Sequence, residues 1–245
     1  MTAMPRPRHA IYFAPPSDGP LWSLASAIIG WDAAAARALP FPDSEPCNAA
    51  DWPALTAEPR RYGFHATLKA PFELDAAADE AMLIAAARAF AATRRPFDLP
   101  QPTVATLGSF VAVQPGAASA ELASLAADAV VAFEPFRAPL APADLARRLA
   151  ANLTERQAAA VHRWGYPYVF EDFRFHMTLT GPLPAERRES VRAALAELLG
   201  DTIRPLTIDA LAIFRQDDRD GPFHIVERCP FGARAPDFPH AGLTR

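Results

Sequence analysis

The sequence predicts a mixed helix-and-strand fold built from two halves of similar design. Segments with helical spacing of apolar residues alternate along the 245 residues with short β-compatible runs. A nine-residue pattern that begins at Phe64 recurs at Phe175, so that His65 and His176 lie 111 residues apart (176 minus 65). Two copies at so long a period predict two similar lobes that face each other, because repeat arrays have many copies and much shorter periods.

The composition is that of a globular chain with a substantial core. It is 51% hydrophobic and 21% charged, which fits one large domain or two closely joined lobes. The net charge of -4 argues against a basic surface for long nucleic acid or anionic membranes. Cys47 and Cys229 belong to no CxxC pattern, so we expect neither a disulfide framework nor a zinc site, and a cytoplasmic location. No apolar stretch reaches the ~20 residues of a membrane span, and no export signal is seen at the start of the chain.

The first half predicts a strand at 9–14, a helix at 21–29 behind Asp18 and Gly19, and a long proline-rich loop at 40–59. An extended segment at 61–74 follows. The region after it is predicted to form a helix at 76–93, strands at 97–104 and 109–114, and helices at 118–133 and 142–164. We expect a break in the last of these helices near 152–154.

The second half repeats the order of the first. It predicts an extended segment at 168–179, a helix at 184–199, and strands at 206–215 and 223–228. The letters match as well, because F-H-x-T-L-x-x-P-F at 64–72 aligns with F-H-x-T-L-x-x-P-L at 175–183.

Each motif has residue types that suit phosphate chemistry. In a strand, alternate side chains share a face, so His65 and Thr67 point together, as do His176 and Thr178. Imidazole titrates near neutral pH, so two histidines across a cleft can act as an acid and a base. Threonine hydroxyls can donate to phosphate oxygens, and this arrangement requires no metal or other cofactor. A core role would not explain why the polar faces of both copies match.

Two cations extend the predicted site. Strand parity places Lys69, the only lysine of the chain, beyond Thr67, and places Arg174 before His176. A guanidinium can bind phosphate through two hydrogen bonds and an ammonium as a point charge. For either residue, a solvated charge at a strand end is an equally good interpretation.

Other polar residues favour structural interpretations. The remaining histidines have no metal-ligand partner at helical or hairpin spacing, and Glu171 with Asp172 resembles a charge cluster at a strand entry. Gly108 and Gly116 form no phosphate-binding loop, and the G-x-G-x-x-G, G-x-x-x-x-G-K and G-x-S-x-G patterns are absent. These remaining histidines are His9, His162, His224 and His240.

The paired H-x-T-L motifs resemble those of the 2H phosphoesterase superfamily. The longer strings R-Y-G-F-H-A-T-L-K-A-P-F at 61–72 and F-R-F-H-M-T-L-T-G-P at 173–182 resemble one branch, encoded beside bacterial phosphonate-utilisation genes. The resemblance covers the chain from the first strand to Arg228. It implies a bilobal α+β fold in which two pseudo-two-fold-related lobes line a central cleft with antiparallel sheets and carry helices outside.

The resemblance also implies a function. It makes residues 1–245 a single phosphoesterase domain, with motif halves at about 1–115 and 166–245 and a helical connection at about 116–165. It implies a metal-independent hydrolase of a small cyclic phosphate, with His65 and His176 catalytic, and Thr67, Thr178, Lys69 and Arg174 binding phosphate. A small-molecule phosphate ester as partner and a monomeric state are expected. The alternatives are a non-catalytic phosphate-binding module and a 2′,3′-cyclic phosphodiesterase acting on RNA ends.

Overall fold

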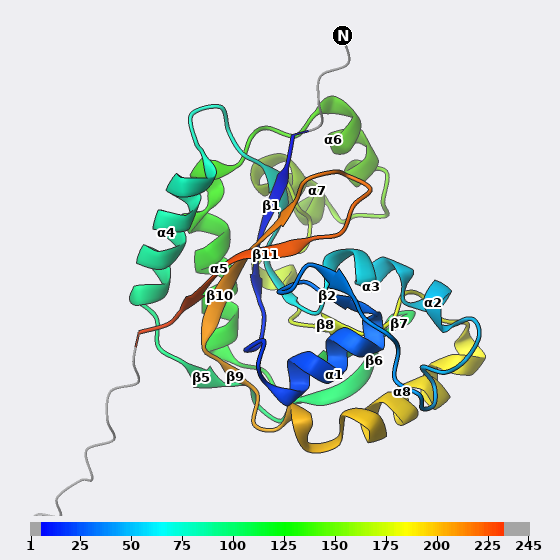
Figure 1. The fold of residues 1–245 in the computed structure, drawn as a ribbon. Helices are drawn as coiled ribbons and strands as arrows, with labels where there is room; N and C mark the ends of the chain where they lie inside the picture. Colours follow the sequence, from blue (N-terminus) through cyan, green and yellow to red (C-terminus); the bar gives the residue numbers. More distant parts are fainter. Residues whose placement is uncertain (1–5, 233–245) are drawn as a thin grey trace, which may run out of the picture.

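The computed structural model describes residues 6–232 and has an α+β architecture, as the sequence predicts (Figure 1). The α-helices within these residues alternate with strands in the first half and gather between the two motifs in the middle of the chain. They are α1 (Pro20–Ile29), α2 (Trp52–Leu55), α3 (Ala57–Tyr62), α4 (Glu80–Ala92), α5 (Ala120–Ala132), α6 (Pro142–Leu149), α7 (Glu155–Trp164) and α8 (Ala185–Leu199). Three short 3-10 helices, η1 (Glu134–Phe136), η2 (Phe170–Asp172) and η3 (Gly200–Ile203), join them.

Most strands form one antiparallel sheet. Its order is β11-β10-β1-β4-β8-β7-β6, so the strands of the two motifs, β4 and β8, are direct neighbours. The two sheets that the resemblance implies on either side of a cleft are therefore one continuous sheet here, and the pseudo-two-fold relation of the halves stays a prediction. The strands are β1 (Arg8–Phe13), β4 (Ala66–Glu73), β6 (Thr103–Leu107), β7 (Phe110–Gln114), β8 (Met177–Thr178), β10 (Ala210–Gln216) and β11 (His224–Pro230). Two small pairs lie outside it, β2 (Trp31–Asp32) with β3 (Arg37–Ala38), and β5 (Phe97–Asp98) with β9 (Thr207–Ile208).

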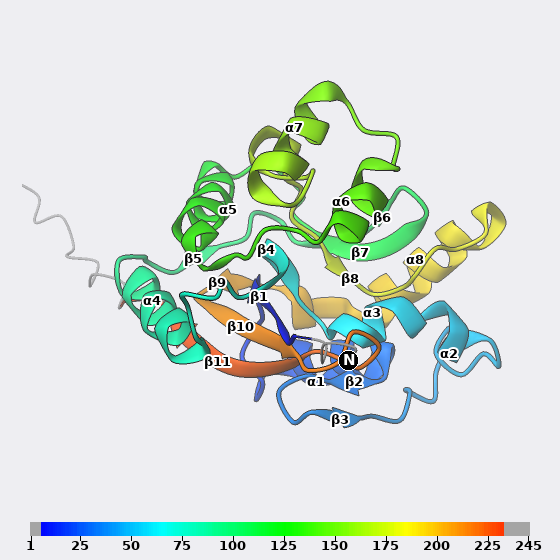
Figure 2. The same cartoon turned by 90° about the horizontal axis from the view of Figure 1, so that it is seen from above.

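Local sequence explains where the helices start and stop. Pro20 begins α1, and Gly30 ends it in the left-handed conformation with φ of 81°. Thr154 and Gln157 form a capping box at the start of α7, which accounts for the predicted break between α6 and α7. These two helices stand together on the side of the molecule away from α1 (Figure 2).

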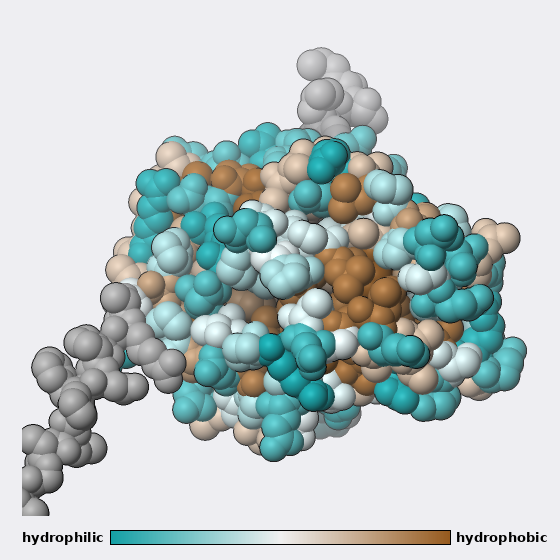
Figure 3. Space-filling model, turned by 60° about the horizontal axis from the view of Figure 1, so that its bottom comes forward, coloured by the Kyte–Doolittle hydropathy of each residue, from teal (hydrophilic) through white to brown (hydrophobic). Residues whose placement is uncertain are grey.

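The core occupies both faces of the sheet. A large cluster around Ile11, Phe13 and Met177 packs one face, and a smaller aromatic cluster that includes Tyr12 and Phe214 packs the other. Hydrophilic residues cover much of the face drawn in Figure 3, and its largest group of apolar residues lies right of the centre. In the part of the chain that the structure describes, no helix combines the length and apolar character needed to cross a membrane.

Three predicted segments differ from the structure. The proline-rich loop at 40–59 contains α2 and the start of α3, because prolines occupy early positions in short helices. Arg61 and Tyr62 are helical, so the first extended segment begins only at β4. The segment at 168–179 is mostly irregular and forms a strand only at Met177–Thr178.

Candidate functional site

Both H-x-T motifs line the same cavity. His65, Thr67, His176 and Thr178 border one open cavity of about 520 Å³. Each of these four side chains is half-buried, whereas Phe64, Ala66, Phe175 and Met177, next to the histidines, are buried in the core. The polar faces of two chain segments that are far apart in sequence therefore meet in one cleft.

The two imidazoles are held in the same way. His65 Nδ1 lies 2.9 Å from the carbonyl oxygen of Gly63, and His176 Nδ1 lies 2.8 Å from that of Arg174. Since a carbonyl oxygen only accepts, each Nδ1 carries the proton and donates. Nε2 of each ring is therefore the atom available to a ligand. In His65 it lies 3.4 Å from the hydroxyl oxygen of Thr67.

Gly63 gives the chain its turn into the first motif. Its φ of 78° is left-handed, and a Cβ there would lie 2.7 Å from Cβ of Ala33. A side chain at position 63 would therefore displace the carbonyl that orients His65.

Burial disfavours the charged form of both histidines. Desolvation lowers the pKa of His65 to about 4, opposed by the bond to Gly63 and assisted by the nearby His176. Desolvation also lowers the pKa of His176, opposed by its bond to Arg174. The ring of His65 stacks on Tyr12 with centroids 3.7 Å apart, while His176 has Phe110 at 5.6 Å. With the proton on Nδ1, the neutral form of each ring carries a lone pair on Nε2.

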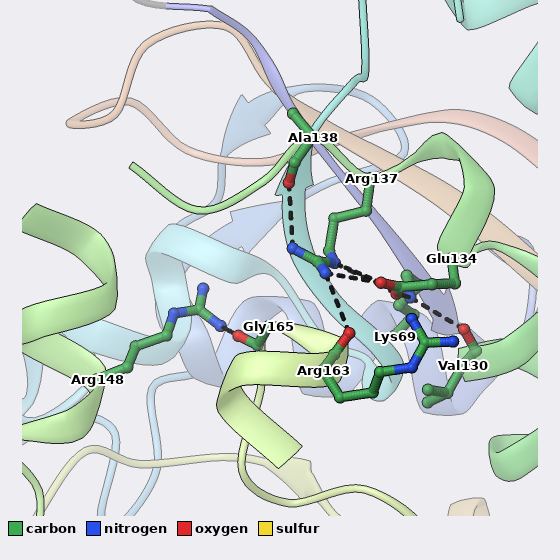
Figure 4. A network of polar contacts seen from close by, with 8 residues as sticks. All are labelled: Lys69, Val130, Glu134, Arg137, Ala138, Arg148, Arg163 and Gly165. Carbon is green, nitrogen blue, oxygen red and sulfur yellow. Dashed lines mark hydrogen bonds and ion pairs between the residues drawn. The ribbon is translucent and has the colours of Figure 1, made fainter. Parts of the chain in front are cut away.

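Lys69 does not share the face of His65 and Thr67, contrary to the strand-parity prediction. Thr67 pairs with Tyr12 of β1 and Lys69 with Ile11, so β4 advances two residues where β1 advances one. This β-bulge turns Lys69 to the opposite face. Its ammonium donates to Glu134 at 2.8 Å and to the Val130 carbonyl at 3.0 Å, within the network of Figure 4. Burial lowers the pKa of Lys69, and Glu134 opposes that change.

Arg174 lies beside the shared cavity rather than in it. It is exposed and borders a neighbouring cavity of about 520 Å³, which His176 and Thr67 also border. Aromatic side chains form much of that second cavity, among them Phe110, Trp164 and Tyr166. The roles of Lys69 and Arg174 toward phosphate stay predictions. Of the six predicted site residues, the four motif residues are the ones that border the cavity shared by both histidines.

The cleft contains basic and aromatic residues that sequence patterns missed. Arg8 reaches it from the start of β1, and Arg147 and Arg148 reach it from α6. Tyr12, Tyr62 and Tyr166 supply aromatic walls. One sequence signal could have found Arg8, because it shares strand parity with Tyr12 in β1. Arg148 is in a helix far from both motifs in sequence, and no spacing rule connects it to them.

The other titratable residues have structural partners or lie elsewhere. His9 is buried and its Nε2 lies 2.8 Å from Glu80, while Asp172 pairs with Arg156. Cys47 and Cys229 are free and buried, and burial raises the pKa values of their thiols to about 12 and about 11. Residues 6–232 contain no group of three or more metal-ligating side chains, and His240 lies outside the described residues.

Curated relatives carry a kinase name. The ribose 1,5-bisphosphate phosphokinase PhnN of Janthinobacterium sp. (strain Marseille) is 39% identical over 251 residues, covering 96% of this chain and 53% of that protein. The protein of the same name from Laribacter hongkongensis (strain HLHK9) is 37% identical over 219 residues, covering 89% of this chain and 50% of that protein. The chain thus spans about half the length of the curated relatives it matches.

These names overturn the predicted reaction. The motifs predicted a phosphoric diester hydrolase, whereas a phosphokinase transfers a phosphoryl group and is a transferase. The predicted connection with phosphonate metabolism and with a small phosphate ester agrees with the names of the relatives.

A family model matches the middle of the chain, including the second motif and Thr67 of the first. The match covers residues 67–224, well over half of the sequence, and the family is described as a protein of unknown function, DUF1045. The chain therefore belongs to the DUF1045 family.

Proposed function

We propose that this chain binds a small phosphate ester in the cleft between its two H-x-T motifs. The observation that carries the proposal is that His65, Thr67, His176 and Thr178 all border one cavity. A structural role for either histidine alone would not require the other to lie in the same cavity. In both motifs Nδ1 donates to the carbonyl two residues earlier, which leaves Nε2 of each ring available to a ligand.

The chemistry of the four side chains suits a phosphate group. Each threonine hydroxyl can donate one hydrogen bond to a phosphate oxygen. A neutral imidazole accepts at Nε2 from a protonated phosphate oxygen, and a protonated one donates there. Because an anion favours the charged form of a neighbouring base, phosphate binding raises the pKa of both histidines. Binding is then coupled to proton uptake in the range where the free imidazoles are neutral.

The proposed ligand class is a ribose phosphate of phosphonate metabolism. Support comes from the relatives, whose name specifies a ribose bisphosphate, and from a cavity of about 520 Å³, the size of a small-molecule site. The sequence has no G-x-x-x-x-G-K pattern, the loop with which P-loop enzymes hold nucleotide phosphates. The proposal for this chain is therefore recognition of the phosphate ester rather than the whole kinase reaction.

We also propose that the motifs place the chain in the 2H superfamily as a single domain over residues 1–245. Support comes from the two intact motifs and from their matching tethers. This part of the proposal concerns ancestry and site geometry and does not extend to hydrolysis, since the curated relatives are named as kinases.

Isothermal calorimetry with ribose 5-phosphate tests the binding proposal. We expect His65→Ala and His176→Ala each to weaken binding by about tenfold or more, because each removes a hydrogen bond to a charged group. His162→Ala is the matched control, since His162 is exposed on α7 and outside the cleft. Urea unfolding of each variant checks that it folds. Equal affinity in the wild type and both cleft variants, or no binding by the wild type, would contradict the proposal.

A further inference from the structure

Two arginines in the cleft have no acidic partner. Within residues 6–232, neither Arg8 nor Arg148 forms an ion pair, although both are half-buried. The Arg8 guanidinium donates to the side-chain oxygen of Gln216, and Arg148 donates to the carbonyl of Gly165 (Figure 4). Both acceptors are neutral, so each guanidinium keeps its full charge and has further N–H donors to offer.

The arginines next to them are paired differently. Arg147 pairs with Asp144, and Arg219 pairs with both Asp144 and Glu73. Acidic side chains are thus within the same neighbourhood but pair with other cations. Among the described residues, the one carboxylate that borders the cleft is Glu58. It lies beside Gly181, shortly after the second motif. Asp144 also acts on Arg148 and raises its pKa. Arg8, Arg147, Arg148 and Arg219 nevertheless outnumber the two carboxylates beside them, so this end of the cleft has a net positive charge.

Arg8 and Arg148 lie close to each other. Both border the main cleft, and both border a small adjoining cavity. Burial lowers the pKa of each, and the charge of Arg8 also contributes to lowering that of Arg148. A half-buried, unpaired cation is costly, and two that repel each other are more so, unless an anion binds between them.

Their position relative to the histidines is set by β1. Arg8 and Tyr12 share one face of this strand, whose pairing with β10 is regular from Arg8 to Tyr12. Four residues of strand span about 13 Å. Since Tyr12 stacks on His65 and both arginines border the same cleft, the arginines lie further along the cleft than the histidines.

We propose that Arg8 and Arg148 form a second anion subsite, which binds the second phosphate of a bisphosphate ligand whose first phosphate lies between the histidines. This inference rests on the proposed function and adds the ligand class: a sugar with two phosphate groups rather than one. A guanidinium binds a phosphate through two parallel hydrogen bonds, so two of them can hold a dianion. Arg148 also packs near the ring of Tyr166, at 5.9 Å, which limits its movement.

Calorimetry with ribose 1,5-bisphosphate, ribose 5-phosphate and inorganic phosphate tests the second subsite. We expect the wild type to bind the bisphosphate at least about tenfold more tightly than the monophosphate. Arg8→Gln and Arg148→Gln should each weaken bisphosphate binding by about tenfold, and should change monophosphate binding much less. Arg95→Gln is the control for the loss of one positive charge, because Arg95 is exposed and outside both large cavities.

The outcomes separate this inference from the proposed function. Equal affinity of the wild type for both sugar phosphates, or equal losses for both ligands in the arginine variants, would overturn the second subsite and leave the histidine site standing. No binding of any phosphate by the wild type would overturn both. Because Arg148 also holds Gly165, Arg8→Gln is the second, independent variant if Arg148→Gln fails to fold.

Discussion

The two motifs share a sequence frame and a backbone tether, yet they hold their histidines in different surroundings. His65 lies over the smaller aromatic cluster and stacks on Tyr12, which is buried. His176 precedes a two-residue strand and has the partly exposed Phe110 at its side. The same local sequence therefore gives two half-buried imidazoles, one stacked on a buried ring and the other beside a partly exposed ring. Identical motif residues therefore need not have identical surroundings in the folded protein.

The largest expected effect concerns the two aromatic neighbours. Tyr12→Ala should lower the free energy of unfolding by about 4 kcal/mol, because it empties a buried site under His65. Phe110→Ala should cost about 2 kcal/mol, since Phe110 faces a cavity on one side. Urea unfolding measures both, with Tyr12→Phe as the control that keeps the ring. Equal losses at the two sites would remove the distinction between a packed and an open end.

The positions two residues after the motif threonines should differ in how much they contribute to stability. Lys69 and Thr180 occupy equivalent places (180 minus 69 is again 111), and both are buried. Lys69→Ala leaves the Glu134 carboxylate with Arg137 alone and should cost about 3 kcal/mol.

Thr180→Ala removes hydrogen bonds to Val111 and Gly181 and should cost about 1.5 kcal/mol. Urea unfolding compares the two variants. A larger loss for Thr180→Ala would show that Lys69 contributes little through its ion pair with Glu134. Lys69→Arg is a conservative control, because it keeps the charge.

The pH dependence of the free energy of unfolding should reveal the lowered pKa of His65. The pKa of His65 falls to about 4 in the fold, so the unfolded chain takes up its proton first as the pH drops. The resulting stability is complete above pH 6.5 and is lost as the pH falls towards 4, by about 2 kcal/mol in the partly open cleft. Urea unfolding of the wild type and of His65→Gln from pH 7.5 to 4.5 measures it. A wild-type profile unchanged in His65→Gln would show that His65 keeps an ordinary pKa.

The smallest expected effect is in the threonines, where we expect the two motifs to be equal. Thr67→Val and Thr178→Val each keep the shape and remove one hydroxyl donor, so each should weaken ribose 5-phosphate binding by about tenfold. Calorimetry measures the affinity, and Thr93→Val on the exposed end of α4 is the control. A loss at only one threonine would mean that the phosphate contacts one motif and not the other.

Sequence patterns predicted the fold class and many of the elements. Helices α1, α5 and α8 follow apolar periodicity and cap residues, and Thr154 accounts for the break before α7. The alternation rule also correctly paired His65 with Thr67, because no bulge separates them. The binding roles of these residues stay predictions until they are tested with a ligand.

The remaining features depend on tertiary structure. The β-bulge that turns Lys69 away from the cleft arises from the pairing of β4 with β1, which local alternation cannot reveal. Arg8 and Arg148 come together because α6 lies beside the start of β1 in the folded chain (Figure 1). The reaction predicted from the motifs was wrong because a motif specifies which groups meet at a site, and not which reaction they serve.

The short pairing between the two motif strands affects how the distance between the imidazoles is fixed. β4 and β8 meet at a single register pair, Ala66 with Met177, each the residue that follows a histidine. A long ladder would fix the spacing of the imidazoles through backbone geometry. Here β8 is held by this one pair, by its pairing with β7 and by the burial of the Met177 side chain, a residue type that adapts to its neighbours. A substitution at Met177 would therefore be expected to alter the distance between the two imidazoles without replacing a residue that borders the cleft.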